Sequence, residues 1–325
     1  MKAVRKDAAF VLLCPSLSAR SQTLCLEKGI DFIDLAGNLS ISVPGKLLIQ
    51  RTGQKVPEKI TASFYRNPFS GKSSRILRVL LQRPGRWTLS DILQELESET
   101  NRNPWAGPTC RTSISEVSEP SKSRPLVEFR PKCFEVSAGF ASRVLRSLEE
   151  ELLVVRQNSA VTLPEPRRLL TRWAEEYKKR VRWDLRKSLT LPNPFGTDLA
   201  SVTRGLDTLF NADWPNGPNR YAFRAAAAAS ITAPFVDIDL IDLFVSNERA
   251  AELLRTSISG PGLGPELRVI YPYDIGVFMY GAVREGVPGV SDIQAYLDLF
   301  ARGGRDLKQA DYLFEKRIAP SWASK

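Results

Sequence analysis

The sequence predicts a multidomain chain of mixed α/β class (α+β), in which a helical segment lies between two parts that combine strands and helices. Three observations lead to this prediction. Short apolar strands surround one helix at the start of the chain. Three amphipathic segments and a hairpin follow, and strands alternate with helices again near the end. With 325 residues, the chain is long enough for about two or three domains.

Residues 1–55 have the pattern of a β-α-β-β region. Gly29 follows an amphipathic segment, as expected where a helix ends, and Asp34-Leu-Ala-Gly-Asn38 predicts a turn. The expected elements are a helix at 19–28 and strands at 10–13, 30–33, 39–43 and 46–51. A core of about fifty residues is small for an independent domain, so we expect this region to be part of something larger.

Residues 56–165 predict three helices followed by a hairpin. The helices are expected at 70–81, 89–97 and 137–151, and the hairpin strands at 152–155 and 160–163. This order is that of a winged helix-turn-helix. A long insertion at 98–135, rich in proline and polar residues, separates the second helix from the third and is predicted to lack regular structure.

In a winged helix-turn-helix the third helix enters the major groove of double-stranded DNA, and the hairpin contacts it as a wing. Arginine can read guanine through two hydrogen bonds or hold a phosphate. The alternatives are a three-helix core with a purely structural role and a protein-binding module. The candidate DNA-binding residues lie on the first helix, the third helix and the wing: Lys72, Arg75, Ser137, Ser142, Arg143, Arg146, Arg156, Gln157 and Asn158.

The positive charge of the chain lies in its first part. Residues 1–190 hold 33 basic and 20 acidic side chains, a net charge of +13, whereas residues 191–325 hold 13 and 16, a net charge of −3. Basic residues concentrate at 46–86 and 167–187. Clusters of this kind suit phosphate binding, although such runs are also common on ordinary solvated surfaces. The asymmetry therefore favours DNA as the partner of the first part and another partner for the second.

The remaining sequence predicts a basic linker helix at 166–190 and a C-terminal α/β domain at 191–325. Leu169, Leu170, Trp173 and Tyr177 share one face of the linker helix, which we interpret as a packing face. In the C-terminal domain, helices are expected at 221–231, 248–255, 292–300 and 306–318, and strands at 239–245, 267–271, 275–280 and 283–290.

Composition excludes several functions. The chain contains no histidine, so a Ser-His-Asp or Cys-His triad and histidine-containing zinc sites are impossible. No apolar run approaches the ~20 residues of a membrane span, and the first ten residues do not resemble a signal peptide. The four cysteines form no Cys-x-x-Cys motif. We therefore expect reduced thiols, a cytoplasmic location and no membrane partner.

Two groups of carboxylates are the candidates for metal chemistry. Asp31 and Asp34 offer too few oxygen ligands for two-metal hydrolysis. The predicted turn at 34–38 also accounts for Asp34 without a metal. Asp237-Ile-Asp239 with Asp242 resembles the paired aspartates of nucleotidyltransferases, but the expected Gly-Ser turn does not precede them. We therefore expect no metal, no cofactor and no catalysis. A degenerate nuclease or a nucleotidyltransferase-like enzyme is the alternative.

Five motifs together resemble bacterial regulators related to the AbiEi antitoxin of type IV toxin–antitoxin systems. The resemblance spans nearly the whole chain except the insertion at 98–135. The motifs are Asp34-Leu-Ala-Gly-Asn38, the segment from Ser73 to Leu81, Leu169-Leu-x-x-Trp173-x-x-x-Tyr177, Tyr271-Pro-Tyr-Asp274, and the segment from Gln294 to Leu299.

This resemblance implies a restriction-endonuclease-like region, then a winged helix, then a C-terminal domain. Residues 1–55 would be a partial endonuclease-like region, because no Glu-x-Lys motif precedes Phe10. It also implies a non-catalytic transcriptional regulator that binds double-stranded DNA and whose C-terminal domain binds a partner, such as a cognate toxin.

Overall fold

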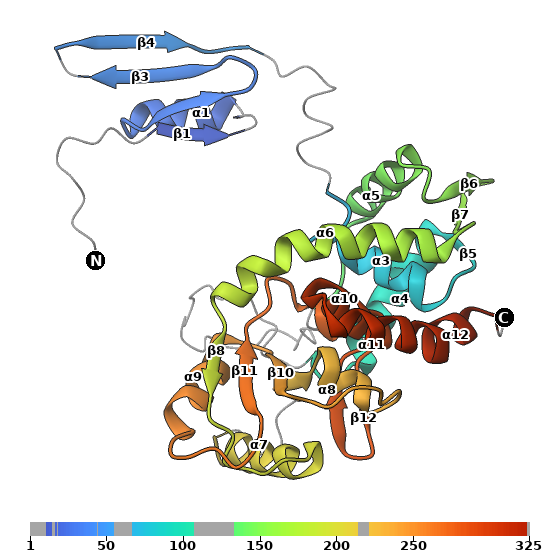
Figure 1. Ribbon diagram of the computed structural model, residues 1–325. Helices are drawn as coiled ribbons and strands as arrows, with labels where there is room; N and C mark the ends of the chain where they lie inside the picture. The colour runs from blue at the N-terminus through green and yellow to red at the C-terminus, as the bar shows by residue number, and fades with distance from the viewer. Residues whose placement is uncertain are drawn as a thin grey trace, which may run out of the picture. The chain divides into compact units, whose positions relative to one another are not determined.

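The computed structural model describes residues 11–14, 17, 19–43, 45–54, 67–106, 133–213 and 221–323. The chain divides into two compact units, Met1–Asn67 and Pro68–Lys325. The segments 56–165, 166–190 and 191–325, which we expected as separate parts, thus lie mainly within the second unit. The fold is of mixed α/β class with several sheets (Figure 1).

The first unit has the expected β-α-β-β order. Its four-stranded sheet has the order β1-β2-β3-β4, with β1 parallel to β2 and the other pairs antiparallel. A helix between β1 and β2 makes the crossover that parallel strands require. The elements are β1 (Val11–Cys14), α1 (Ala19–Glu27), β2 (Asp31–Asp34), β3 (Leu39–Val43) and β4 (Leu47–Arg51).

The second unit begins with three helices and a small sheet. Thr88 starts the second helix with a capping box that includes Asp91. That helix continues to Arg102, so the expectation that the insertion begins at residue 98 is wrong, and residues 107–132 lie outside the described residues. The elements are α3 (Ser73–Gln82), β5 (Arg86–Thr88), α4 (Leu89–Arg102), α5 (Ala138–Glu150), β6 (Val155–Gln157) and β7 (Ala160–Thr162), with sheet order β5-β7-β6.

A six-stranded sheet forms the rest of the second unit. The long helix α6 (Pro166–Arg186) leads from the small sheet to this one (Figure 1). The sheet has the order β12-β13-β9-β10-β11-β8, with β10 parallel to β11 and antiparallel to β9. Its strands are β8 (Leu189–Leu191), β9 (Tyr221–Phe223), β10 (Leu240–Val245), β11 (Glu266–Ile270), β12 (Ala282–Arg284) and β13 (Val287–Gly289).

Helices cover both faces of this sheet. Along β10, Ile241, Leu243 and Val245 belong to the core that α7 and α9 share, whereas Phe244 belongs to the core that contains α10. This alternation is what a strand buried on both faces requires. The helices are α7 (Leu199–Asp213), α8 (Ala225–Ser230), α9 (Glu248–Ser257), α10 (Asp292–Arg302), α11 (Arg305–Leu313), the π-helix η3 (Phe314–Ile318) and α12 (Ala319–Ala323).

Further sequence-based expectations differ from this architecture. The first hairpin strand, expected at 152–155, is β6 at Val155–Gln157, and the strand expected at 283–290 is the antiparallel pair β12 and β13. The helix expected at 221–231 is the strand β9 followed by the short helix α8, because Tyr221–Phe223 is buried between β13 and β10. The strand expected at 275–280 is a 3₁₀-helix, η2 (Ile275–Phe278), capped by the Asp274 carboxylate. Cys133 is disulfide-bonded, so the expectation of reduced thiols is wrong there, while Cys14 and Cys25 are free.

The helix α3 joins the two halves of the second unit. Every residue from Ser74 to Leu81 is buried, because α4 and α5 cover one side of the helix and C-terminal elements cover the other. At its end the indole nitrogen of Trp322 donates to the carbonyl of Leu81 at 2.8 Å. One hydrophobic core therefore runs from the three helices into α10 and α11.

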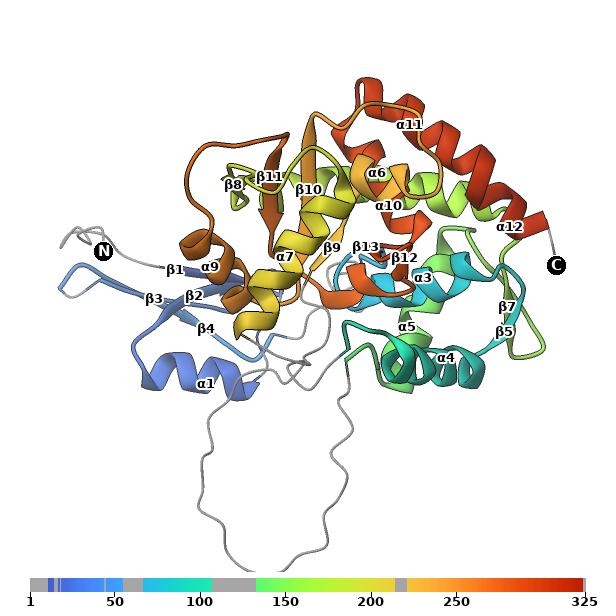
Figure 2. The same ribbon diagram turned by 90° about the horizontal axis from the view of Figure 1, so that it is seen from below.

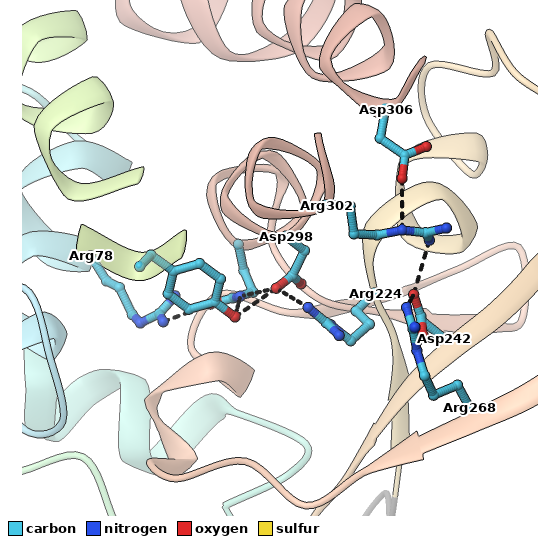
Figure 3. Close-up of polar contacts among 9 residues, drawn as sticks. Arg78, Arg224, Asp242, Arg268, Asp298, Arg302 and Asp306 are labelled. Atoms are coloured by element: carbon cyan, nitrogen blue, oxygen red, sulfur yellow. Dashed lines mark hydrogen bonds and ion pairs between the residues drawn. The ribbon is translucent and has the colours of Figure 1, made fainter. Parts of the chain in front are cut away.

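A polar network lies within this shared core (Figure 3). The Asp298 carboxylate is fully buried, and its Oδ1 accepts from Arg224 at 2.5 Å, Tyr177 at 2.6 Å and Gln294 at 2.9 Å. The Gln294 side-chain oxygen in turn accepts from Arg78 on α3 at 2.6 Å. Because an unpaired buried charge is costly, this network links elements: Asp298 connects α10 with α6 and with the start of α8, and Gln294 connects α10 with α3.

We predict that Asp298→Asn lowers the free energy of unfolding by about 3–5 kcal/mol, since Arg224 would lose the carboxylate with which it forms an ion pair, and Asp242 is the other buried carboxylate that acts on it. Denaturant unfolding followed by far-UV circular dichroism measures this change. The exposed Asp311→Asn on α11 is the matched control and should leave the midpoint close to that of the wild type. Equal unfolding midpoints for Asp298→Asn and the wild type would contradict the stabilising role assigned to Asp298.

Candidate nucleic-acid interface

The helix α5 presents one buried and one exposed face. Ser137 caps it by accepting a hydrogen bond from the Phe140 amide at 3.3 Å. The buried face consists of Ala141, Val144, Leu145 and Leu148, which pack into the shared core. Helical spacing then turns the side chains of Arg143 and Arg146 to solvent, and both are exposed. Ser137 is also exposed, whereas Ser142 is half-buried.

The hairpin β6–β7 lies next to α5 and is joined to it by an ion pair. Asn158 and Ser159 have φ of 47° and 62°, as a two-residue type I′ turn requires. The Arg156 guanidinium lies 3.3 Å from the Glu149 carboxylate of α5, and both side chains are exposed. Arg156, Gln157 and Asn158 therefore form an exposed edge beside the helix. Both views place α5 and this hairpin at the opposite end of the second unit from α7 and α9 (Figures 1 and 2).

Charge changes sign along α5. Arg143 and Arg146 lie in its middle, and within the described part of the chain no ion pair engages either of them. Glu149, Glu150 and Glu151 follow at the carboxyl end, where Glu149 and Glu151 pair with arginines. An anion would therefore be attracted to the amino-terminal two thirds of the helix and repelled from its end.

The two candidates at the start of α3 differ in exposure. Lys72 is exposed at the position that precedes the helix. Arg75 is only 4% exposed, and its guanidinium makes two hydrogen bonds to the Asp274 carboxylate, at 2.7 and 3.0 Å, and one to the Cys133 carbonyl at 2.8 Å. Because the C-terminal segment covers this side of α3, Arg75 cannot contact DNA, and we withdraw it from the candidate interface.

The basic residues of α6 are partly neutralised. Arg172 pairs with Glu176 at 2.7 Å and with Glu151 at 3.3 Å, and Lys179 also pairs with Glu176 at 2.7 Å. An open hollow of about 530 Å³ lies beside the helix, and its charged walls are mixed: Arg167, Arg168, Arg172, Glu151, Glu165 and Glu175. The surface of α6 is therefore less basic than its sequence indicates.

The carboxylates considered for metal chemistry are engaged by protein groups. Asp34 accepts amide hydrogen bonds from Leu17, Ala36 and Asn38 and a side-chain bond from Asn38, at 2.9–3.1 Å, which confirms the predicted turn. Burial would raise the pKa of Asp34, but these hydrogen bonds lower it overall. Asp242 is fully buried and pairs with Arg268 and Arg302 (Figure 3).

Within the described ranges, no group of three or more carboxylates and cysteines could hold a metal ion. In the same ranges, no helix is long and apolar enough to cross a membrane. No family model, no curated protein and no solved structure matches the chain. The assignment of a function therefore rests on the residues and their geometry.

We predict that Asp274→Asn destabilises the protein by about 3 kcal/mol near neutral pH, because Arg75 would remain buried without a charged partner. Burial acts to raise the pKa of Asp274, but the guanidinium of Arg75 lowers it overall. The stabilisation is therefore complete above the unfolded-state pKa near 4 and is lost as the pH falls through the lower folded-state pKa.

Urea unfolding at several pH values tests this prediction. The difference between wild type and Asp274→Asn should be largest above about pH 5 and should shrink towards about pH 2. A difference that stays constant over this range would show that the charge of Asp274 is not responsible. Lys72→Ala, at the exposed position that precedes the same helix, serves as a control that should not change the unfolding midpoint.

Proposed function

We propose that the protein is a transcriptional regulator of AbiEi-antitoxin type that binds double-stranded DNA and acts without catalysis, metal or cofactor. The observation that carries this proposal is the order α3-β5-α4-α5-β6-β7 with sheet order β5-β7-β6. This order is typical of a winged helix-turn-helix, and the third helix, α5, exposes two arginines.

In this proposal α5 lies in the major groove. Arg143 and Arg146 contact base edges or phosphates, and Ser137 at the amino end of the helix approaches the backbone, as helix amino termini commonly do. Arg156, Gln157 and Asn158 of the hairpin contact the neighbouring stretch of the duplex. Glu149 already pairs with Arg156, and Glu150 and Glu151 at the carboxyl end would lie away from the phosphates, which fixes the direction of α5 in the groove.

The C-terminal part would bind a different partner. Residues 191–325 have a net charge of −3, which does not favour nucleic acid. A cognate toxin is the partner that the proposed family implies, and a regulator of bacterial DNA would act in the cytoplasm. Co-purification of the protein with the product of a neighbouring gene would test this part separately from DNA binding.

We predict that the double substitution Arg143→Ala with Arg146→Ala weakens binding to the promoter of the protein's own gene. The substitution should also reduce discrimination against unrelated DNA, because each bidentate contact contributes about 1–3 kcal/mol of base discrimination. Fluorescence anisotropy with promoter and scrambled duplexes measures both quantities.

The matched control is Arg204→Ala with Arg255→Ala, which removes the same charge from α7 and α9 at the far end of the unit. This control should change neither affinity nor selectivity by more than a few fold. Unchanged selectivity in the α5 double variant would reject α5 as the reading helix.

We further predict that promoter binding weakens steeply with salt, since each neutralised phosphate releases about one counterion. Lys72→Ala and Arg156→Ala should each reduce the slope of log K against log[salt] by about one if each side chain holds a phosphate. A salt-independent affinity would exclude a DNA interface of this kind.

A further inference from the structure

A small cavity lies where α3, α6 and the segment before η2 meet. Its volume is about 40 Å³, enough for a few heavy atoms. Arg78 and Ser74 of α3 form one wall, Trp173 and Tyr177 of α6 another, and Pro272 to Asp274 a third. Side chains from parts of the sequence that are far apart thus line one site.

The surroundings of the cavity carry more buried positive than negative charge. Arg75 pairs with Asp274, and Arg224 pairs with Asp298. Arg78 is 3% exposed, and its Nη2 donates to the neutral Gln294 side chain rather than to a carboxylate. Burial lowers the pKa of Arg78 to about 10, so the group is still charged at neutral pH. Among the described residues, Arg78 therefore has no carboxylate within ion-pair distance, although Asp274 and Asp298 are near enough to oppose the lowering of its pKa.

Arg78 also has unused hydrogen-bond donors. Its Nε and Nη1 atoms are buried and have no partner among the described residues. Its guanidinium lies 5.0 Å from the centroid of the Trp173 ring, which cannot accept a conventional hydrogen bond. Unsatisfied charged donors are costly inside a protein, so this arrangement suits a bound acceptor.

A second cationic group lies at the mouth of the cavity. The Arg180 guanidinium of α6 stacks on the ring of Tyr273 at 3.4 Å from its centroid, and the Tyr273 side chain is exposed. Gly71 and Ser74 line the same space, but the amides of Ser74 and Arg75 already donate to the carbonyls of Gly71 and Lys72, so the two guanidinium groups are the donors left for an anion. A group entering from solvent would thus pass Arg180 and end at Arg78.

We propose that this cavity is a binding site for a small oxyanion group, a phosphate or a carboxylate, carried by a small molecule. Arg78 would donate to the oxyanion from one of its two unpartnered nitrogens, Nη1 or Nε, whose N–H bonds point in different directions, and Arg180 would neutralise the remaining charge. The cavity is far below the 300–1,000 Å³ or so of a typical site for a drug-sized ligand. Only the charged end of the ligand would therefore be buried, and the rest would extend past Tyr273 into solvent.

The test measures thermal stability and binding heat of the full-length protein with sodium phosphate, sodium acetate or sodium chloride at equal ionic strength. Phosphate or acetate should raise the Tm relative to chloride by ~3 °C once its concentration is well above Kd. If phosphate binds more tightly than acetate, the natural ligand carries a phosphate group. If acetate binds more tightly, the ligand carries a carboxylate. No rise with either oxyanion overturns the proposal.

Arg78→Met is the decisive variant, because methionine fills similar space without charge or donors. It should abolish the oxyanion-dependent rise and reduce the affinity at least ~10-fold, while its own Tm in chloride should not fall greatly. Arg204→Met on α7 is the matched control and should retain the full rise. An equal rise in wild type and Arg78→Met would mean non-specific anion binding and would overturn the proposal.

Arg180→Met provides the same test if Arg78→Met does not fold, because Arg180 lies at the mouth of the cavity and is only partly buried. It should weaken oxyanion binding several fold without changing the Tm in chloride. Undiminished binding in this variant would overturn the proposed path into the cavity. Neither measurement involves DNA, so failure here would leave the proposed regulatory function to its own tests.

Discussion

The second unit depends on the burial of three arginines where α3 meets the C-terminal sheet and its helices. Buried guanidinium groups need partners that stay in place, and Arg75 and Arg224 obtain them from Asp274 and Asp298. Removal of the C-terminal half would leave the arginines of α3 beside exposed apolar surface. The three helices and hairpin therefore cannot be treated as a detachable module, even though their order along the chain is that of an independent one. The C-terminal half also contributes to the hydrophobic core against which α5 packs.

Net charge alone gives an inaccurate map of the surface. The first 190 residues have a net charge of +13, yet Arg75 and Arg78 are inside the protein, and Arg172 and Lys179 are paired with glutamates. Exposed basic groups without ion pairs among the described residues include Arg143 and Arg146 of α5. The interface that we propose is therefore small and local. It relies on the direction of one helix and the position of one hairpin rather than on a broad basic field.

The elements that the sequence predicts correctly are those determined by residues close together in the chain. The β-α-β-β order, the helices α3 to α5 and the outward face of α5 follow from periodicity and capping residues within a few positions. The strand β5 was missed, and 221–223 was assigned to a helix, because both strands exist only through pairing with distant strands. Arg75 was misplaced for the same reason, since its partner Asp274 is 199 positions away. The cavity at Arg78 was not foreseen, because its walls come from segments whose meeting no local pattern encodes.

Four of the five motifs behind the proposed family assignment lie at or next to the cavity, and the fifth, Asp34–Asn38, lies in the first unit. The segments 73–81, 169–177 and 271–274 supply its walls, and 294–299 supplies the amide and carboxylate that hold Arg78 and Tyr177 in place. None of these segments lies on α5 or on the hairpin. Under the proposed AbiEi-type assignment, such proteins would share the buried charged residues around the cavity rather than the surface that reads DNA. A change of operator would then require substitutions on α5 and the hairpin alone, because the buried residues around the cavity include none of those proposed to contact bases.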